Sequence, residues 1–321
     1  RKFLIKINEL MKTEFDNTEN EAFSIARVSG STGLNVLSLF DGMSCGQIAL
    51  EKAKIKVNKY FASEIEKEAI KVTMKNYPNT LQVGSVLDVK ASNLPKIDLL
   101  IGGSPCQSFS NAGRGAGFDG KSGLFWEYVR ILKEVKPTYF LLENVKMKKE
   151  WQDIISEALG VEPIEINSKF FVPQNRPRLY WTNVEGKNIP TSFNHCINDV
   201  LEDASNEYYL TEKQKSILDL NFKWSENEII RHKAGKHQQD NIFRYDGIMG
   251  CLSASTHGAA RHLTKTYLPN GEIRRLTENE VEKLQGVPIN YTDNVSSSKR
   301  YEMLGNGWTV DVIAHIFGGL S

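Results

Sequence analysis

Long apolar runs are absent from this sequence: no stretch of eighteen or more uncharged apolar residues occurs, so we expect no membrane-spanning helix. The opening segment, RKFLIKINELMKTEFDNTEN, mixes basic and acidic side chains too closely for a secretory signal peptide. Cysteine is scarce, with four residues and no Cys-x-x-Cys pair, which argues against a disulfide framework and against structural zinc. These absences predict a cytoplasmic protein without a metal and without a membrane partner.

An excess of either charge is also lacking, because 40 Lys and Arg residues stand against 39 Asp and Glu residues. This balance neither requires nor excludes nucleic acid, since a local basic groove is enough to contact phosphates. Apolar side chains, by contrast, make up 40% of the 321 residues. That quantity supports one large domain, or a large domain with a smaller one.

Short apolar runs alternate with helical segments through the first half of the chain. Strands separated by helices of this length predict an α/β fold built on a parallel, doubly wound sheet. The expected strands are 35–40, 57–64, 97–103 and 139–144, and the expected helices are 47–52, 66–76, 123–135 and 150–159.

Regular periodicity is lost after residue 182, where the chain becomes polar with scattered aromatic side chains. Helical periodicity returns at 276–286, where Thr277 and Glu280 predict a capping box at the helix start. The α/β domain is therefore expected to be interrupted by an insertion, after which the chain returns to the α/β domain. The predicted divisions are a leader segment, 1–33, an α/β domain, 34–182 and 272–321, and an inserted domain, 183–271.

A glycine-containing turn, LFDGMSCGQIAL, follows the first expected strand, and Glu64 ends the second. Both lie at the carboxyl edge of a doubly wound sheet, where glycines admit a ligand and an acid can bind ribose hydroxyls. A tight turn without any ligand is an alternative, as are NAD and FAD. The Gly42-x-x-x-Gly46 spacing differs from the dinucleotide pattern G-x-G-x-x-G, which favours S-adenosylmethionine, a ligand without pyrophosphate.

A candidate nucleophile, Cys106, follows Pro105 directly after another buried strand, in the segment GGSPCQSFS. Glu143 ends a neighbouring buried strand, and Arg176 and Arg178 share one side of the chain if their segment is a strand. Each has an ordinary explanation alone: an inert thiol, a carboxylate satisfied by the backbone, solvated arginines. Together they predict a single catalytic cleft.

The motifs FDGMSCG, GGSPCQSFS, ENV, QNRPR, RRLT and GNGWTV occur in this order, and the series resembles the C5-cytosine DNA methyltransferase family. The stretches SGLFWEY and GNGWTVDVIAHIF look closest to the de novo branch and its phage and bacterial relatives. The resemblance implies a Rossmann-like, S-adenosylmethionine-dependent methyltransferase domain with an inserted target-recognition domain. It also implies a DNA (cytosine-5)-methyltransferase that flips a cytosine out of duplex DNA.

The same resemblance assigns roles in the reaction. Cys106 would add covalently to C6 of cytosine, Glu143 would hold the N3/N4 edge, and Arg178, with Arg176, would hold the O2 side or a phosphate. S-adenosylmethionine would become S-adenosylhomocysteine, and no metal is implied. The residues implied to line the cofactor site are Phe40, Asp41, Gly42, Gly46, Glu64, Ile65, Ser85, Val86, Leu124 and Asn306.

Two positions depart from the family pattern. Ser85 stands where many members carry an acid that meets the adenine amine, and Gly307 stands where serine is usual in bacterial enzymes. The first departure puts one cofactor contact in doubt. Neither removes a catalytic group.

Basic residues mixed with Asn, Gln and Tyr in the insertion suit phosphate contacts and the readout of base edges. A solvated polar subdomain is the alternative. Double-stranded DNA is the expected partner of a protein that acts as a monomer, with self-association as a lesser alternative. The residues expected to contact nucleic acid are Ser108, Arg114, Arg231, Lys233, Arg244 and Arg261.

Two other functions remain open at this point. One branch of the family methylates tRNA, so a tRNA (cytosine-5)-methyltransferase is the first alternative. A DNA-binding relative without activity is the second, although the presence of Cys106, Glu143 and Arg178 argues against it.

Overall fold

A computed structural model of the chain describes residues 33–105, 123–186, 188–236, 240–254 and 265–320. Most of the expected leader segment and four predicted site residues, Cys106, Ser108, Arg114 and Arg261, lie outside the described residues. Among the described residues, no helix combines the length and apolar character that are needed to cross a bilayer.

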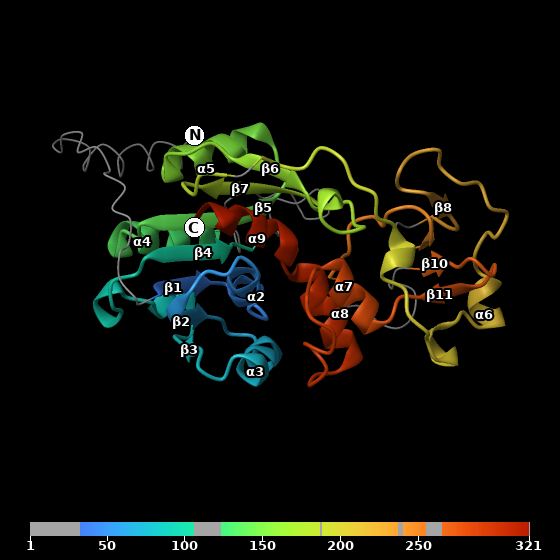
Figure 1. Ribbon diagram of the computed structural model, residues 1–321, viewed down its shortest axis with the longest axis horizontal. Coiled ribbons are helices and arrows are strands. Elements are labelled where there is room, and N and C mark those ends of the chain that lie inside the picture. The colour runs from blue at the N-terminus through green and yellow to red at the C-terminus, as the bar shows by residue number, and fades with distance from the viewer. Residues whose placement is uncertain (1–32, 106–122, 187, 237–239, 255–264, 321) are drawn as a thin grey trace. The chain divides into compact units, whose positions relative to one another are not determined.

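Seven strands form the larger sheet, in the order β3-β2-β1-β4-β5-β7-β6 (Figure 1). The strands from β3 to β5 run parallel, as expected, but β7 is antiparallel to both of its neighbours. Only residues 168–176 join β6 to β7, too few for the crossover that a parallel neighbour requires. The strand bounds are β1 Leu34–Leu39, β2 Val57–Ser63, β3 Leu81–Gln82, β4 Leu99–Gly103, β5 Tyr139–Val145, β6 Ile164–Asn167 and β7 Pro177–Thr182.

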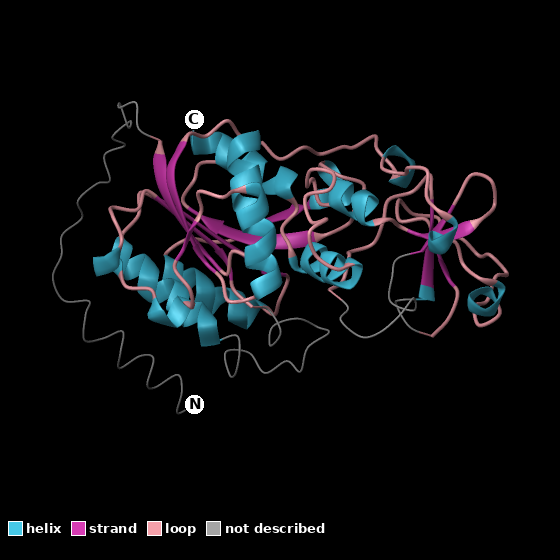
Figure 2. Ribbon diagram, turned by 90° about the horizontal axis from the view of Figure 1, so that it is seen from below, coloured by secondary structure: helices cyan, strands magenta, loops and turns pink. Residues whose placement is uncertain are grey.

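Helices cover both faces of this sheet (Figure 2). Val36 and Leu99 belong to the core under one set of helices, whereas Leu37 and Leu100 belong to the core under the other. Because both faces are buried, these strands read as continuous apolar runs rather than as alternating patterns. One set is α2 Cys45–Lys52, α3 Lys67–Asn76 and α9 Val310–Phe317, and the other is α4 Phe125–Val135 and α5 Lys149–Leu159.

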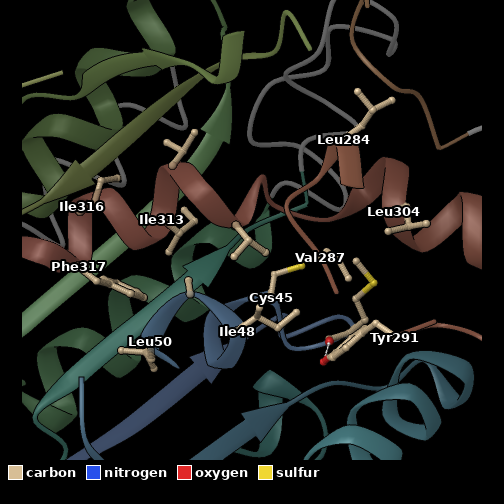
Figure 3. Close-up of a cluster of buried hydrophobic side chains, with 14 of the residues drawn as sticks. Cys45, Ile48, Leu50, Leu284, Val287, Tyr291, Leu304, Ile313, Ile316 and Phe317 are labelled. Atoms are coloured by element: carbon tan, nitrogen blue, oxygen red, sulfur yellow. Dashed lines mark hydrogen bonds between the residues drawn. The ribbon is translucent and has the colours of Figure 1, made fainter. Parts of the chain in front are cut away.

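The end of the chain returns to the first sheet through α7 (Glu278–Leu284), α8 (Ser297–Asn306) and α9. Leu284, Leu304 and Ile313 from these helices share a buried cluster with Ile48 of α2 (Figure 3). The predicted capping box is confirmed: Thr277 Oγ1 accepts from the Glu280 amide at 3.1 Å, and Glu280 Oε2 accepts from the Thr277 amide at 2.7 Å. This packing places the turn between α8 and α9 beside the first strands.

Four short strands form a second sheet, in the order β11-β10-β9-β8. It has a small core of its own, with Ile242 and Ile273 buried beneath the aromatic rings of Phe222 and Trp224. The bounds are β8 Arg231–Lys233, β9 Asn241–Arg244, β10 Lys265–Tyr267 and β11 Ile273–Arg275, with the short helix α6 at Glu212–Lys215. The sheet thus includes β11, which begins beyond the boundary expected at residue 271.

Candidate active site

A cavity of about 550 Å³ opens at the carboxyl edge of the larger sheet. Its walls come from the segments that follow β1, β2, β4 and β5, and from the turn between α8 and α9. The chain leaves β1 towards β2 on one side and reaches β4 on the other, so the order of the strands reverses at this point. A reversal of strand order is where open α/β sheets bind their ligands.

Nine of the ten residues predicted to line a cofactor site contribute to this cavity, and Gly46 is the exception. Gly46 lies inside α2, where a Cβ atom would stand 2.6 Å from Ile101 Cδ1 and 2.7 Å from Tyr60 Oη. Its lack of a side chain therefore allows α2 to pack closely on the sheet. The nine are Phe40, Asp41, Gly42, Glu64, Ile65, Ser85, Val86, Leu124 and Asn306.

The Glu64 carboxylate ties the first turn to the end of β2. Its Oε2 accepts from the Gly42 amide at 2.7 Å, and its Oε1 accepts from the amides of Ile65 at 2.7 Å and Glu66 at 2.9 Å. Gly42 has a φ of +59°, which favours glycine, and a Cβ atom there would meet nothing within 4 Å. A carboxylate can accept about four hydrogen bonds, so Glu64 retains capacity for a ligand hydroxyl.

A second carboxyl, Asp41, lies in the same turn and accepts hydrogen bonds from the hydroxyls of Tyr60, at 2.7 Å, and Ser44. Burial raises the pKa of Asp41 to about 6, against the hydrogen bonds of Ser38, Ser44 and Tyr60, which lower it. The cavity therefore contains an acid whose charge changes close to neutral pH.

The chemistry of the lining fits S-adenosylmethionine. Ile65 and Leu87 are large apolar residues that remain 69% and 62% exposed at the cavity, where an aromatic ring system would cover them. The carboxyl groups of Glu64 and Asp41 suit a ligand that carries hydroxyl groups and a positive charge. The basic side chains in the lining are already engaged with protein groups, which disfavours a pyrophosphate ligand; they are Arg176, Arg178 and Lys299.

Glu143 and Arg178 meet at one side of the cavity. Arg178 Nε lies 3.0 Å from Glu143 Oε1, and the Trp308 indole N–H donates to Glu143 Oε2 at 3.1 Å. Burial lowers the pKa of Arg178, but the charge of Glu143 together with Cys251 and Tyr180 outweighs burial, and the pKa is raised. Pro105, the residue before Cys106, lines the same cavity, so the structure brings this end of β4 to the pair.

Arg176 is held differently from Arg178. Its Nη1 donates to the Leu252 carbonyl at 3.0 Å, and its Nη2 donates to the carbonyls of Gly305 and Gly307, both at 2.9 Å. The side chain is buried, and burial lowers its pKa, as does the neighbouring charge of Arg178. Its guanidinium therefore links the backbone at Leu252 to the backbone at Gly305 and Gly307 through hydrogen bonds at the wall of the cavity.

Sequence reasoning missed two side chains at this site. Trp308 was visible in the GNGWTV motif, but no signal placed it against Glu143. Cys251 is exposed, with its sulfur 3.4 Å from Arg176 Nη1 and 3.8 Å from Arg178 Nη2. Partial shielding of the sulfur by neighbouring protein atoms would raise the pKa of Cys251, but the charges and hydrogen bonds of the two guanidinium groups outweigh this effect, and the pKa is lowered.

The predicted nucleic-acid residues of the second sheet fall into two groups. Arg231 and Lys233 flank the buried His232 on β8, so both point to the exposed face of that strand. Arg244 lies on the opposite face from Arg231 and Lys233. The buried His232 pairs with Ile242, and Arg244, two residues further along β9, shares the face of Ile242. Arg244 is bound to Asp246, with contacts of 2.6 and 2.8 Å, and lies over the Trp224 ring.

A family model described as C-5 cytosine-specific DNA methylase matches residues 34–321. The chain belongs to this family. It is 32% identical over 293 residues to the orphan methyltransferase M.Rho11sI of Bacillus phage rho11s, covering 86% of this chain and 53% of the relative. It is 27% identical over 309 residues to the type II methyltransferase M.HhaI of Haemophilus parahaemolyticus, covering 89% of this chain and 93% of the relative.

The chain thus spans about half the length of the Bacillus phage relatives that it matches. Solved structures confirm the predicted fold class. The Dnmt2 methyltransferase of S. pombe aligns with a TM-score of 0.67 at 19% identity, covering 90% of this chain and 99% of its own. The Entamoeba histolytica methyltransferase EhMeth aligns with a TM-score of 0.70 at 19% identity, with the same coverage.

Proposed function

We propose that this chain is a DNA (cytosine-5)-methyltransferase, which transfers a methyl group from S-adenosylmethionine to C5 of a cytosine flipped out of duplex DNA. The observation that carries the proposal is the Glu143–Arg178 pair, which lies in the same cavity as Glu64 and Pro105. Membership of the C5-cytosine methylase family supports it.

S-adenosylmethionine would supply an electrophilic methyl group when bound, with S-adenosylhomocysteine as the product. Glu64 would accept from its ribose hydroxyls with the lone pairs that the backbone leaves free. Phe40, Ile65 and Leu87 would cover the adenine with apolar surface. Ser85 offers a weaker partner than an acid, because a neutral hydroxyl accepts a weaker hydrogen bond from an amine than a carboxylate does. No metal enters this proposal.

Cys106 would activate the cytosine by covalent addition. Its thiolate forms a bond to C6, and the electron pair displaced from the C5–C6 bond makes C5 nucleophilic. Once C5 carries the methyl group, a base removes the C5 proton. The resulting electron pair restores the double bond, and the C6–S bond breaks to regenerate the thiolate.

Glu143 and Arg178 would hold the flipped ring. Glu143 would accept from the N4 amino group and share a proton at N3, which stabilises the charge that develops as the thiolate adds. Arg178 would donate to O2 or to the adjacent phosphate, for which a planar guanidinium is suited. Arg176 would act indirectly, by fixing the backbone at Leu252 and at the turn after α8.

Duplex DNA is the proposed substrate, bound by one copy of the protein. The insertion that contains the second sheet would recognise the target, with Arg231 and Lys233 contacting phosphates. Ser108, Arg114 and Arg261 remain predicted contacts, as does Arg244 if DNA displaces Asp246. Flipping the cytosine costs a few kcal/mol, which these contacts must offset.

Trapping with 5-fluorocytosine tests the proposal. Fluorine replaces the proton that must leave C5, so an active enzyme should form a denaturation-resistant adduct with duplex DNA in the presence of the methyl donor. Peptide mapping should place the adduct on Cys106, and Cys106→Ala should abolish it while Cys196→Ala retains it. An adduct elsewhere, or none from an active preparation, contradicts the mechanism. Labelled methyl transfer to tRNA rather than to duplex DNA contradicts the substrate.

A further inference from the structure

Trp308 contacts Glu143 although the two residues lie 165 positions apart in the sequence. It occupies the turn between α8 and α9, next to the helix cap Thr309, and its ring lines the cavity. The indole N–H donates to Glu143 Oε2 at 3.1 Å. An indole N–H can only donate, so this contact defines Oε2 as an acceptor.

The sheet is shaped to admit this contact. Gly103, at the end of β4, pairs directly with Glu143 on β5. A Cβ atom at Gly103 would stand 2.8 Å from Trp308 Nε1 and 3.2 Å from Glu143 Oε2. Glycine at position 103 therefore leaves the space that the indole needs to reach the carboxylate.

Both oxygens of Glu143 are consequently held by protein donors. Arg178 Nε binds Oε1, and Trp308 Nε1 binds Oε2. A carboxylate held at one oxygen can still rotate about its last side-chain torsion, whereas contacts at both oxygens fix its plane. Since a carboxylate accepts about four hydrogen bonds, the remaining lone pairs stay available to a substrate.

We infer that Trp308 is a positioning residue for methyl transfer: it holds the Glu143 carboxylate in the plane in which it meets the flipped cytosine. The inference rests on the proposed function, because it assigns Glu143 to the N3/N4 edge of the base. Trp308 would act through Glu143 alone. Its effect on the reaction should therefore depend on whether residue 143 is a glutamate.

A double-mutant cycle tests this dependence. Trp308→Phe keeps an aromatic ring but removes the N–H, and should lower the single-turnover rate of methyl transfer to duplex DNA about 10- to 100-fold. Affinity for S-adenosylmethionine, measured by calorimetry, should change less than about twofold. In a Glu143→Gln background the same substitution should lower the residual rate less than about twofold. Equal losses in both backgrounds, or a rate loss explained by weaker cofactor binding, would overturn the inference.

Trp151→Phe on α5 is the matched control, and its transfer rate should equal that of the wild type. A second readout does not need activity. In NMR spectra of protein with ¹⁵N-labelled tryptophan, the Trp308 indole resonance is identified as the one that is missing from Trp308→Phe. This resonance should shift in Glu143→Gln, while the Trp151 resonance stays in place. If the wild type methylates no cytosine, the proposed function fails and this spectrum still decides the contact. If methylation occurs but the Trp308 resonance does not shift, the inference alone fails.

Discussion

Arg178 Nε lies 3.0 Å from Glu143 Oε1, and each side chain remains 14% exposed at the cavity. The two residues are diagonal partners across antiparallel strands, since Glu143 faces Tyr180 and Arg178 faces Val145. Their charges are removed from bulk water yet remain accessible to a substrate. An ion pair in that position has electrostatic strength that a solvated surface pair lacks.

Arg178→Lys should reduce the rate of methyl transfer about 10- to 100-fold while leaving the fold intact. Lysine keeps the charge but loses the planar array of donors, so it cannot hold Glu143 and a substrate oxygen together. Single-turnover kinetics on duplex DNA measure the rate, and circular dichroism checks the fold. Arg130→Lys on α4, where the guanidinium is paired with Glu127 and Glu134, is the control and should retain full activity. Wild-type turnover in Arg178→Lys would remove Arg178 from the proposed mechanism.

Arg176 should matter for stability more than its neighbour does. Its guanidinium is buried and binds the carbonyls of Leu252, Gly305 and Gly307, which would lose these donors. Arg176→Met should therefore lower the free energy of unfolding by about 3 kcal/mol or more, whereas Arg178→Lys should cost about 1 kcal/mol or less. Urea denaturation of both variants gives the comparison. The same small loss in both would show that the carbonyls find other partners.

The parts of this fold that the sequence predicts are those encoded locally. Strands buried on both faces leave continuous apolar runs, so β1, β2, β4 and β5 were predicted, and with them the edge where Glu64 and Glu143 emerge. The capping box of α7 was predicted because Thr277 and Glu280 are three residues apart. The antiparallel direction of β7 was not predicted. It depends on the short connection between β6 and β7, and the sequence pattern did not define where these two strands end and begin.

What the sequence did not reveal depends on partners far along the chain. Arg176 belongs to the same motif as Arg178. Only its hydrogen bonds to carbonyls 76 to 131 residues away distinguish this buried side chain from Arg178, which pairs with Glu143 at the cavity. Gly46 looks like a ligand-binding glycine, but its surroundings, Ile101 and Tyr60, come from other strands. Tertiary packing determines such roles, and a single sequence does not show it.

The thiols of Cys251 and Cys45 should differ strongly in reactivity. Burial raises the pKa of Cys45 to about 12, whereas Arg176 and Arg178 lower that of Cys251, which is exposed. Because the thiolate is the nucleophile, iodoacetamide at pH 7.5 should alkylate Cys251 at least about tenfold faster than Cys45. Peptide mass spectrometry over a time course measures both rates. Arg178→Met should slow the labelling of Cys251, and an unchanged rate would contradict the role given to the guanidinium.

Asp41 should make the stability of the protein depend on pH in a defined window. Its pKa is raised from 3.8 to about 6 in the folded chain, mainly because burial disfavours the charged form. Well below pH 3.8 both states are protonated, so no penalty arises. As the pH rises, the unfolded chain ionises first, and the folded state loses relative stability until about pH 6. This rise in the pKa corresponds to about 3 kcal/mol of stability, lost as the pH rises through the window.

Asp41→Asn removes this titration. The free energy of unfolding of the variant, minus that of the wild type, should rise between about pH 4 and pH 6 and then remain level, as measured by urea denaturation at half-unit steps. Any change in the hydrogen bonds to Tyr60 and Ser44 adds a constant offset, which leaves the shape of the curve unaltered. A flat difference curve for Asp41→Asn would mean that Asp41 ionises in the folded protein as readily as in the unfolded chain.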